Sequence, residues 1–134
     1  MSSKPGAQHL ALRFRSGLEK QVAAQIASAG HEVRFEDEKI VYVKPESHHK
    51  YTRDFRLDNG IIIETKGIFD ADDRQKHLLI KAQHPEKDIR FVFTRSASKL
   101  YKGSPTSYAD WCRKNGFQFA DRRIPDAWFK ELPK

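Results

Sequence analysis

The clearest alternation of apolar and polar positions in this chain lies on either side of one turn signal. The tripeptide Asp58-Asn59-Gly60 separates two short runs that together span residues 54–66, and this pattern predicts a β-hairpin. Successive side chains of a strand point to opposite faces. One face of the hairpin is therefore expected to pack on a core through four apolar residues, namely Phe55, Leu57, Ile61 and Ile63.

The other face of this hairpin carries charged residues, and the turn decides whether they meet. With a three-residue loop that closes at a left-handed Gly60, Asp54 falls opposite Glu64, and Lys66 shares their face. A two-residue turn at Asn59-Gly60 would shift the register by one position and separate the two carboxylates. Any site on this hairpin therefore depends on the register.

Apolar residues at helical spacing predict three helices. The first runs from Ser16 to Ala29, the second from about Asp70 to His84, and the third from Ser104 or Thr106 to about Asn115. Ser16 and Glu19 have the spacing of a capping box. The residues expected to face the core are Leu18, Val22 and Ile26 in the first helix, Leu78, Leu79 and Ala82 in the second, and Tyr108, Trp111 and Cys112 in the third.

Shorter apolar runs predict strands at residues 33–35, 39–43, 88–94 and 117–120. The run at 39–43 is apolar on both faces, which indicates either burial on both sides or pairing with a second chain. We expect the acidic residues 36–38 to form a solvated turn and the polar residues 44–53 to form a long connector. Helices and strands in this order predict an α/β or α+β fold with a mixed central sheet flanked by helices.

Composition restricts the partners of this chain. Its 134 residues suit one domain, and its formal net charge of +7 favours a polyanion, either nucleic acid or an acidic membrane surface. No apolar run approaches the roughly eighteen residues of a membrane span, and no signal peptide is evident, so secretion is not expected. Cys112 is the only cysteine, which excludes a disulfide framework and favours a reducing compartment.

The predicted hairpin also suggests a chemistry. Two carboxylates a few ångströms apart are unfavourable unless a proton or a cation lies between them, and oxygen ligands suit Mg²⁺ and Mn²⁺. A nearby lysine can orient a water molecule and offset charge on a pentavalent phosphate, so Asp54, Glu64 and Lys66 are typical of metal-assisted phosphodiester hydrolysis. The alternative is a surface hairpin with an ordinary pair between Glu64 and Lys66.

Basic residues in three regions are candidate contacts to DNA phosphates. These regions are a flexible basic arm at residues 1–13, the basic side of the second helix, and a loop at residues 95–107. The candidates are Arg13, Arg15, Arg74, Lys76, His77, Arg95, Lys99 and Lys102. The alternatives are a solvated tail, a helix face that confers solubility and a generic surface loop.

Seven stretches of the chain resemble one known family. They are FRSGLE at 14–19, YTRDF at 51–55, NGI at 59–61, ETKG at 64–67, DDR at 72–74, KHLLI at 76–80 and KLYKGSPTSY at 99–108. They are similar to bacteriophage endonuclease I, the phage-type Holliday junction resolvases of the PD-(D/E)XK nuclease superfamily. The resemblance extends from about residue 14 to residue 128.

The resemblance implies a single nuclease domain over residues 14–134 with a restriction-endonuclease-like core. It also implies a domain-swapped homodimer in which a segment of about residues 39–53 is exchanged between subunits. Glu19 would then come from one subunit and the hairpin residues from the other.

The resemblance further implies the roles of individual residues. Asp54, Glu64 and the Thr65 backbone carbonyl would bind Mg²⁺, or Mn²⁺ as a substitute, with up to two ions in each site. Lys66 would be the catalytic lysine. Glu19 would be an additional active-site acid and metal ligand beyond its capping role.

The implied function is resolution of four-way (Holliday) and other branched DNA junctions by paired incisions, in the cytoplasm of an infected bacterial host. The alternatives are a sequence-specific or repair nuclease of the same superfamily, and a non-catalytic structure-specific DNA-binding protein. The chain departs from the superfamily at Arg53, where a proline usually precedes the aspartate, so we expect the backbone that enters Asp54 to shift. Some relatives carry a basic tail beyond the position of Lys134, which bears on DNA affinity.

Overall fold

A computed structural model describes residues 14–44 and 47–133 of this chain. The predicted arm at residues 1–13, which includes Arg13, lies outside the described residues. In chain order the elements are α2 (Gly17–Ser28), β1 (Lys39–Lys44), β2 (Ser47–Thr52), β3 (Phe55–Arg56), β4 (Ile62–Lys66), α3 (Ala71–Gln83), β5 (Ile89–Phe93), α4 (Tyr108–Asn115), β6 (Phe119–Asp121) and α5 (Asp126–Phe129).

The main sheet has four strands in the order β3-β4-β5-β6. Strand β3 runs antiparallel to β4, whereas β4, β5 and β6 are parallel to one another. The predicted mixed sheet is therefore confirmed, with β5 as an interior strand whose five residues are all buried.

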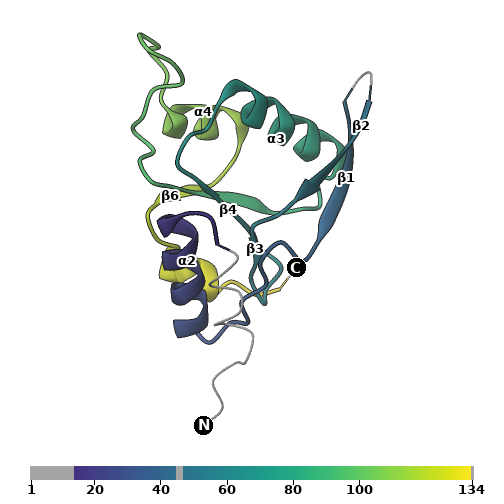
Figure 1. Cartoon of the computed structure of the whole chain (residues 1–134), viewed down its shortest axis with the longest axis vertical. Coiled ribbons are helices and arrows are strands. Elements are labelled where there is room, and N and C mark those ends of the chain that lie inside the picture. Colours follow the sequence, from purple (N-terminus) through teal and green to yellow (C-terminus); the bar gives the residue numbers. More distant parts are fainter. Residues whose placement is uncertain (1–13, 45–46, 134) are drawn as a thin grey trace.

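Helices cover both faces of this sheet. Figure 1 shows α3 and α4 on one side and α2 and α5 on the other. Because side chains alternate along each strand, the two faces of the sheet pack into two separate cores. Ile62 and Phe91 pack with α3 and α4, while Ile63 and Val92 pack with α2 and α5. The buried residues of the hairpin, Phe55, Leu57, Ile61 and Ile63, all belong to the second core, as the sequence predicted.

Strands β1 and β2 form a separate antiparallel hairpin that extends from the body of the protein (Figure 1). The prediction of a connector over residues 44–53 was wrong, because Ser47–Thr52 pairs residue by residue with β1. The predicted strand at residues 33–35 is also absent: Phe35 forms only an isolated bridge with Phe55. Strand β2 was not predicted because its residues are mostly polar, whereas the apolar residues of this hairpin lie mainly on β1.

Burial of β1 on both faces was a wrong expectation. Ile40 and Tyr42 are buried, whereas Val41 and Val43 are 53% and 41% exposed. The outer edge of the strand is covered by α3, since the Gln83 side-chain amide both donates to the Val43 carbonyl and accepts from its N–H, at 2.6 Å each. Further edge pairing at Val43 is therefore blocked, and an apolar face of β1 stays open.

The helix boundaries follow local capping. Ser16 caps α2, and its hydroxyl accepts from the Glu19 N–H at 3.0 Å. The Glu19 carboxylate accepts from the Arg15 N–H at 2.8 Å, not from the Ser16 N–H that a full capping box requires. Helix α4 begins later than predicted, because Ser107 and Asp110 form the capping box.

Helix α3 has its predicted bounds but a different buried face. Its fully buried residues are His77 and Ile80, whereas Leu78 and Leu79 are half-buried and Ala82 is exposed. Cys112 is a buried free thiol whose pKa is raised by burial to about 12. No helix in the described part of the chain is long and apolar enough to cross a membrane.

Candidate active site

The register of the β3–β4 hairpin is the one that a three-residue turn predicts. Phe55 pairs with Ile63, and the Leu57 N–H donates to the Ile61 carbonyl at 2.8 Å. Gly60 closes the turn with a φ of 92°, a conformation that glycine adopts without strain. Asp54 and Glu64 consequently meet, and the Asp54 N–H donates to Glu64 Oε2 at 2.9 Å.

Asp54 is held by the residue that follows Glu64. Its Oδ2 accepts two hydrogen bonds from Thr65, one from the backbone N–H at 2.9 Å and one from Oγ1 at 2.8 Å. Burial, followed by the charge of Glu64, raises the pKa of Asp54 to about 8, because the Thr65 bonds oppose this shift only in part. The hydrogen bonds from Thr65 thus compensate only part of the cost of a charge on Asp54.

Glu64 is almost fully buried, at 2% exposed. Its Oε2 accepts a hydrogen bond from the Tyr51 hydroxyl at 2.6 Å, in addition to the Asp54 N–H. Burial raises the pKa of Glu64, and the charge of Lys66 and the Tyr51 bond work against that rise. Tyr51 is itself buried, which raises its pKa and keeps it a neutral donor.

Tyr51 is a residue of the site that the sequence argument missed. The only signal for it was its place in the YTRDF stretch, three residues before the predicted strand pair. In the structure it lies on β2, so the unexpected hairpin brings this hydroxyl to Glu64. Hydrogen bonds of this kind fix the orientation of a carboxylate that binds a metal.

Lys66 extends along the same face of β4 as Glu64. Its Nζ lies 3.9 Å from Glu64 Oε1 and 3.4 Å from Asp73 Oδ1, and Lys76 Nζ lies 3.7 Å from that same Asp73 oxygen. Asp73 lies in the first turn of α3, where a negative charge favours the start of a helix. The structure adds a second function, because this carboxylate holds two lysines at the site.

The hairpin residues of the site, from Asp54 to Lys66, line a cleft of about 650 Å³. Its lining comprises Arg15, Glu19, Glu36, Lys39, Thr52, Asp54, Glu64, Thr65, Lys66 and Lys76. All four predicted catalytic side chains therefore face one cleft within a single chain. Glu19 reaches it from the first turn of α2, and its charge contributes to the raised pKa of Asp54.

Glu36 was predicted to lie in a solvated turn but belongs to this cleft. It has a φ of 52°, which is strained for a residue with a side chain. Its N–H donates to the Asp54 carbonyl at 2.9 Å, and its carboxylate pairs with the guanidinium of Arg15. The turn therefore also holds the backbone of Asp54 in place.

Arg53, at the position where the resemblance led us to expect a proline, is buried, at 3% exposed. It forms ion pairs with Asp37 and Glu38 of the same turn. A rigid proline is thus replaced by an ion-paired side chain immediately before Asp54. The expected shift of the backbone stays a prediction.

The donors at this cleft suit a hard divalent cation. No three Asp, Glu, His or Cys side chains among residues 14–44 and 47–133 converge closely enough to enclose an ion by themselves. Two mutually repelling carboxylates, Asp54 and Glu64, instead lie beside a backbone carbonyl. Because the Thr65 N–H points to Asp54, and the N–H and C=O of a strand residue leave on the same edge, its carbonyl lies on that edge too. Oxygen donors of this kind suit Mg²⁺ or Mn²⁺.

The residues predicted to contact DNA differ in their exposure and location. Arg95, Lys99 and Lys102 are exposed, while Arg15 and Lys76 line the cleft. Arg74 is half-buried and donates to the Phe69 carbonyl at 2.6 Å.

His77 was wrongly predicted to contact DNA, because it is 0% exposed between the rings of Tyr51 and Phe91. Burial lowers its pKa well below the ordinary value, so the imidazole is neutral and inaccessible.

Comparisons with known proteins identify the family of this chain. A sequence model of the family "Phage endonuclease I" matches residues 2–134. This chain belongs to the phage endonuclease I family. It is 57% identical over 121 residues to "Endonuclease I" of Escherichia phage T7, and the aligned region covers 90% of this chain and 81% of the relative. It is 61% identical over 121 residues to "Endodeoxyribonuclease 1" of Enterobacteria phage T3, which covers 90% of this chain and 80% of that relative.

Proposed function

We propose that this protein is a metal-dependent endodeoxyribonuclease that resolves four-way and other branched DNA junctions. The observation that carries the proposal is the gathering of Asp54, Glu64 and Lys66 in one cleft of a chain that belongs to the phage endonuclease I family. Both relatives named above are phage proteins whose names denote nucleases. We accordingly place the activity in an infected bacterial cell and the nuclease core in the sheet β3–β6 with its flanking helices.

The chain's own residues divide the work of hydrolysis. Asp54, Glu64 and the Thr65 carbonyl would hold one Mg²⁺, and Glu19 would help to hold a second. A metal held by these residues would supply positive charge near the phosphate and would lower the pKa of a nearby water. Lys66 Nζ, held by Asp73 and Glu64, donates a hydrogen bond that orients this water. The products would carry 5′-phosphate and 3′-hydroxyl ends.

Substrate choice in this proposal comes from the shape of the DNA. No recognition helix or base-reading motif is apparent in the sequence, so phosphate contacts would position the junction arms. The exposed Arg95, Lys99 and Lys102 lie on one loop, and Arg15 and Lys76 lie at the cleft itself. Binding by such contacts should weaken steeply as the salt concentration rises.

The proposed dimer exchanges a segment of about residues 39–53, and the open apolar face of Val41 and Val43 supports a second chain there. Within one chain Glu19 already reaches the cleft, so exchange would change which subunit supplies it. A mixture of Glu19→Gln and Glu64→Gln subunits separates the two cases. With exchange, the mixed dimer retains one fully native site and nicks the junction. Without exchange, both sites of the mixed dimer carry a substitution and activity stays absent.

Cleavage of a four-way junction and of a matched linear duplex, each with Mg²⁺ or with EDTA, tests the proposal. We expect metal-dependent incision of the junction, in symmetry-related pairs, and little cutting of the duplex. Equal cutting of both DNAs would retain a nuclease but reject junction resolution. Tight junction binding without any cutting in Mg²⁺ or Mn²⁺ would reject the enzyme.

A further inference from the structure

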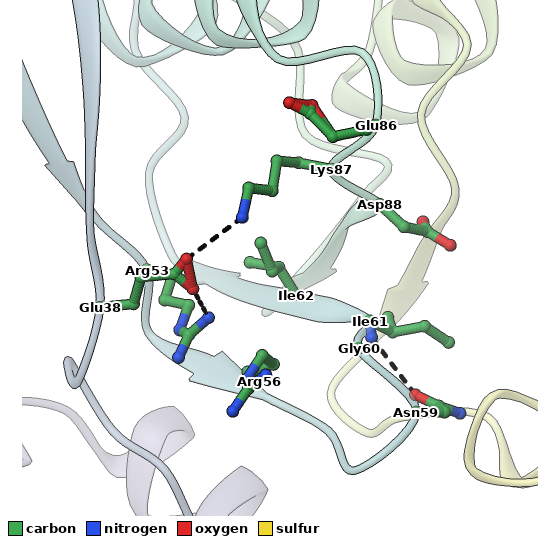
Figure 2. A pocket seen from close by; sticks show the side chains of 10 residues that line it. All are labelled: Glu38, Arg53, Arg56, Asn59, Gly60, Ile61, Ile62, Glu86, Lys87 and Asp88. Atoms are coloured by element: carbon green, nitrogen blue, oxygen red, sulfur yellow. Dashed lines mark hydrogen bonds and ion pairs between the residues drawn. The ribbon is translucent and has the colours of Figure 1, made fainter. Parts of the chain in front are cut away.

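A second pocket, of about 310 Å³, lies at the β3 edge of the main sheet. Figure 2 shows its lining, which comprises Glu38, Arg53, Arg56, Asn59, Gly60, Ile61, Ile62, Glu86, Lys87 and Asp88. It shares no lining residue with the active-site cleft. The two are nevertheless adjacent in the chain, because Arg53 and Glu38 directly precede Asp54 and Lys39 of that cleft.

Two of the three carboxylates that line this pocket are hydrogen-bonded to basic side chains. Glu38 accepts hydrogen bonds from Arg53 and from Lys87, the latter at 3.2 Å, and both are drawn as dashed lines in Figure 2. Asp88 accepts two bonds from Arg90, at 2.9 and 2.8 Å. Glu86 lies 3.5 Å from a ring nitrogen of His84. Glu38 and Asp88 are thus bonded to basic side chains other than Arg56.

Arg56 is the pocket's cation without a counterpart. Its guanidinium forms no ion pair with the described residues, and its Nε is buried with no hydrogen-bond partner among them. Burial lowers the pKa of the neighbouring Arg53, Asp37 opposes that shift, and the positive charge of Arg56 adds to it. Arg56 therefore lies close enough to a second guanidinium for the two charges to repel each other.

A buried N–H without an acceptor is unfavourable, and so is a pair of like charges. Both conditions are relieved if an anion enters the pocket. The planar fork of a guanidinium matches two oxygens of a phosphate, and charge-assisted bonds of this kind are strong. The pocket thus has the chemistry of a phosphate site that the protein alone does not fill.

We propose that this pocket binds a phosphate group of the DNA substrate through the Arg56 guanidinium, alongside the active-site cleft. The proposal rests on the proposed function, since it takes DNA as the substrate. Arg56 lies two residues after Asp54, a distance of at most about 7 Å along an extended chain. One DNA molecule can therefore occupy the cleft and the pocket together.

Junction binding in EDTA, measured over a series of salt concentrations, tests this contact without any requirement for cleavage. For Arg56→Gln we expect roughly tenfold weaker binding at moderate salt and a salt dependence that is lower by about one unit of slope. Arg123→Gln is the matched control, because it removes one exposed arginine that pairs with Asp126 near the opposite edge of the sheet. Equal affinity and slope for the two variants would overturn the proposal.

Two further measurements distinguish a contact between Arg56 and DNA from a structural role of this residue. Arg56→Lys keeps the charge but loses the fork, so its salt slope should match the native protein while its affinity is intermediate. Since Arg56 has no ion-pair partner among the described residues, Arg56→Gln should melt at the native temperature or above it. Lower thermal stability of Arg56→Gln together with unchanged DNA affinity would assign the residue a structural role and overturn the proposal.

Inorganic phosphate distinguishes the source of the anion. At constant ionic strength, phosphate should raise the melting temperature of the native protein more than that of Arg56→Gln. Stabilisation by phosphate without any effect of Arg56→Gln on DNA binding would indicate a site for a free anion, and the DNA contact would be rejected. Cleavage by the native enzyme is scored separately, so native DNA binding with no effect at Arg56 refutes this inference while leaving the proposed function intact.

Discussion

Replacing the half-buried carboxylate of Asp54 by an amide should stabilise the metal-free protein at alkaline pH. The pKa of Asp54 is raised from 3.8 to about 8 in the folded protein, chiefly by burial and by Glu64. The folded state therefore binds this proton more tightly than the unfolded state does, and stability is lost as the pH rises from about 4 to about 8. Asp54→Asn keeps an oxygen for the Thr65 donors but carries no charge, so it should escape this loss.

The size of the effect follows from the shift. About 4 pH units at roughly 1.4 kcal/mol per unit give an upper bound of roughly 6 kcal/mol. Because Asp54 lies on the wall of an open cleft, solvent screens the charge, and we expect about 2 kcal/mol at pH 8.5.

Urea denaturation of both proteins in EDTA, at pH 4, 6 and 8.5, measures this difference. The free energies of unfolding should be nearly equal at pH 4, and Asp54→Asn should be the more stable at pH 8.5. Mg²⁺ should then stabilise the native protein at pH 8.5 and leave the variant unchanged. Asp126→Asn, which alters an exposed carboxylate on α5, is the control and should follow the native curve. A native protein whose stability is constant or rises over this range would refute the reasoning.

Three further predictions concern neighbours of this carboxylate. Tyr51→Phe removes the 2.6 Å hydrogen bond to Glu64 and should lower the free energy of unfolding by about 1.5–3 kcal/mol. Calorimetric titration should also show weaker Mg²⁺ binding, whereas native metal affinity would argue against a positioning role for Tyr51. Lys66→Met should slow single-turnover junction cleavage at least about 100-fold with unchanged DNA affinity, whereas a proportionate loss of binding would make it a mere DNA contact. Arg53→Gln removes the ion pairs with Asp37 and Glu38, of which Glu38 keeps a second partner in Lys87, and should lower the free energy of unfolding by about 2 kcal/mol, in contrast to Arg56→Gln.

Local rules were sufficient to predict much of the fold and the hairpin that carries the site. The Asp-Asn-Gly turn set the register, and the register alone brought Asp54 opposite Glu64. The bounds of α3 followed from the Asp70 cap and from Pro85. These features depend on interactions between residues that are close in sequence, so the local sequence pattern is enough to predict them.

The errors arose where tertiary contacts override the local pattern. Strand β2 is polar by composition, and only its pairing with β1 and the burial of Tyr51 reveal it. His77 reads as part of a basic helix face, but α3 is rotated so that this ring lies against the sheet. Glu36 lies far from the hairpin in sequence, and only the bridge of Phe35 with Phe55 brings it to Asp54.

The most direct test of the central claim is single-turnover cleavage of a saturating, pre-bound four-way junction by the native protein and by Glu64→Gln, with Mg²⁺ varied. Junction affinity is measured on the same samples. The account predicts equal binding by both proteins, metal-dependent cutting by the native protein only, and ends with 5′-phosphates. Cutting by Glu64→Gln at the native rate would contradict the assignment of hydrolysis to the cleft that holds Asp54, Glu64 and Lys66.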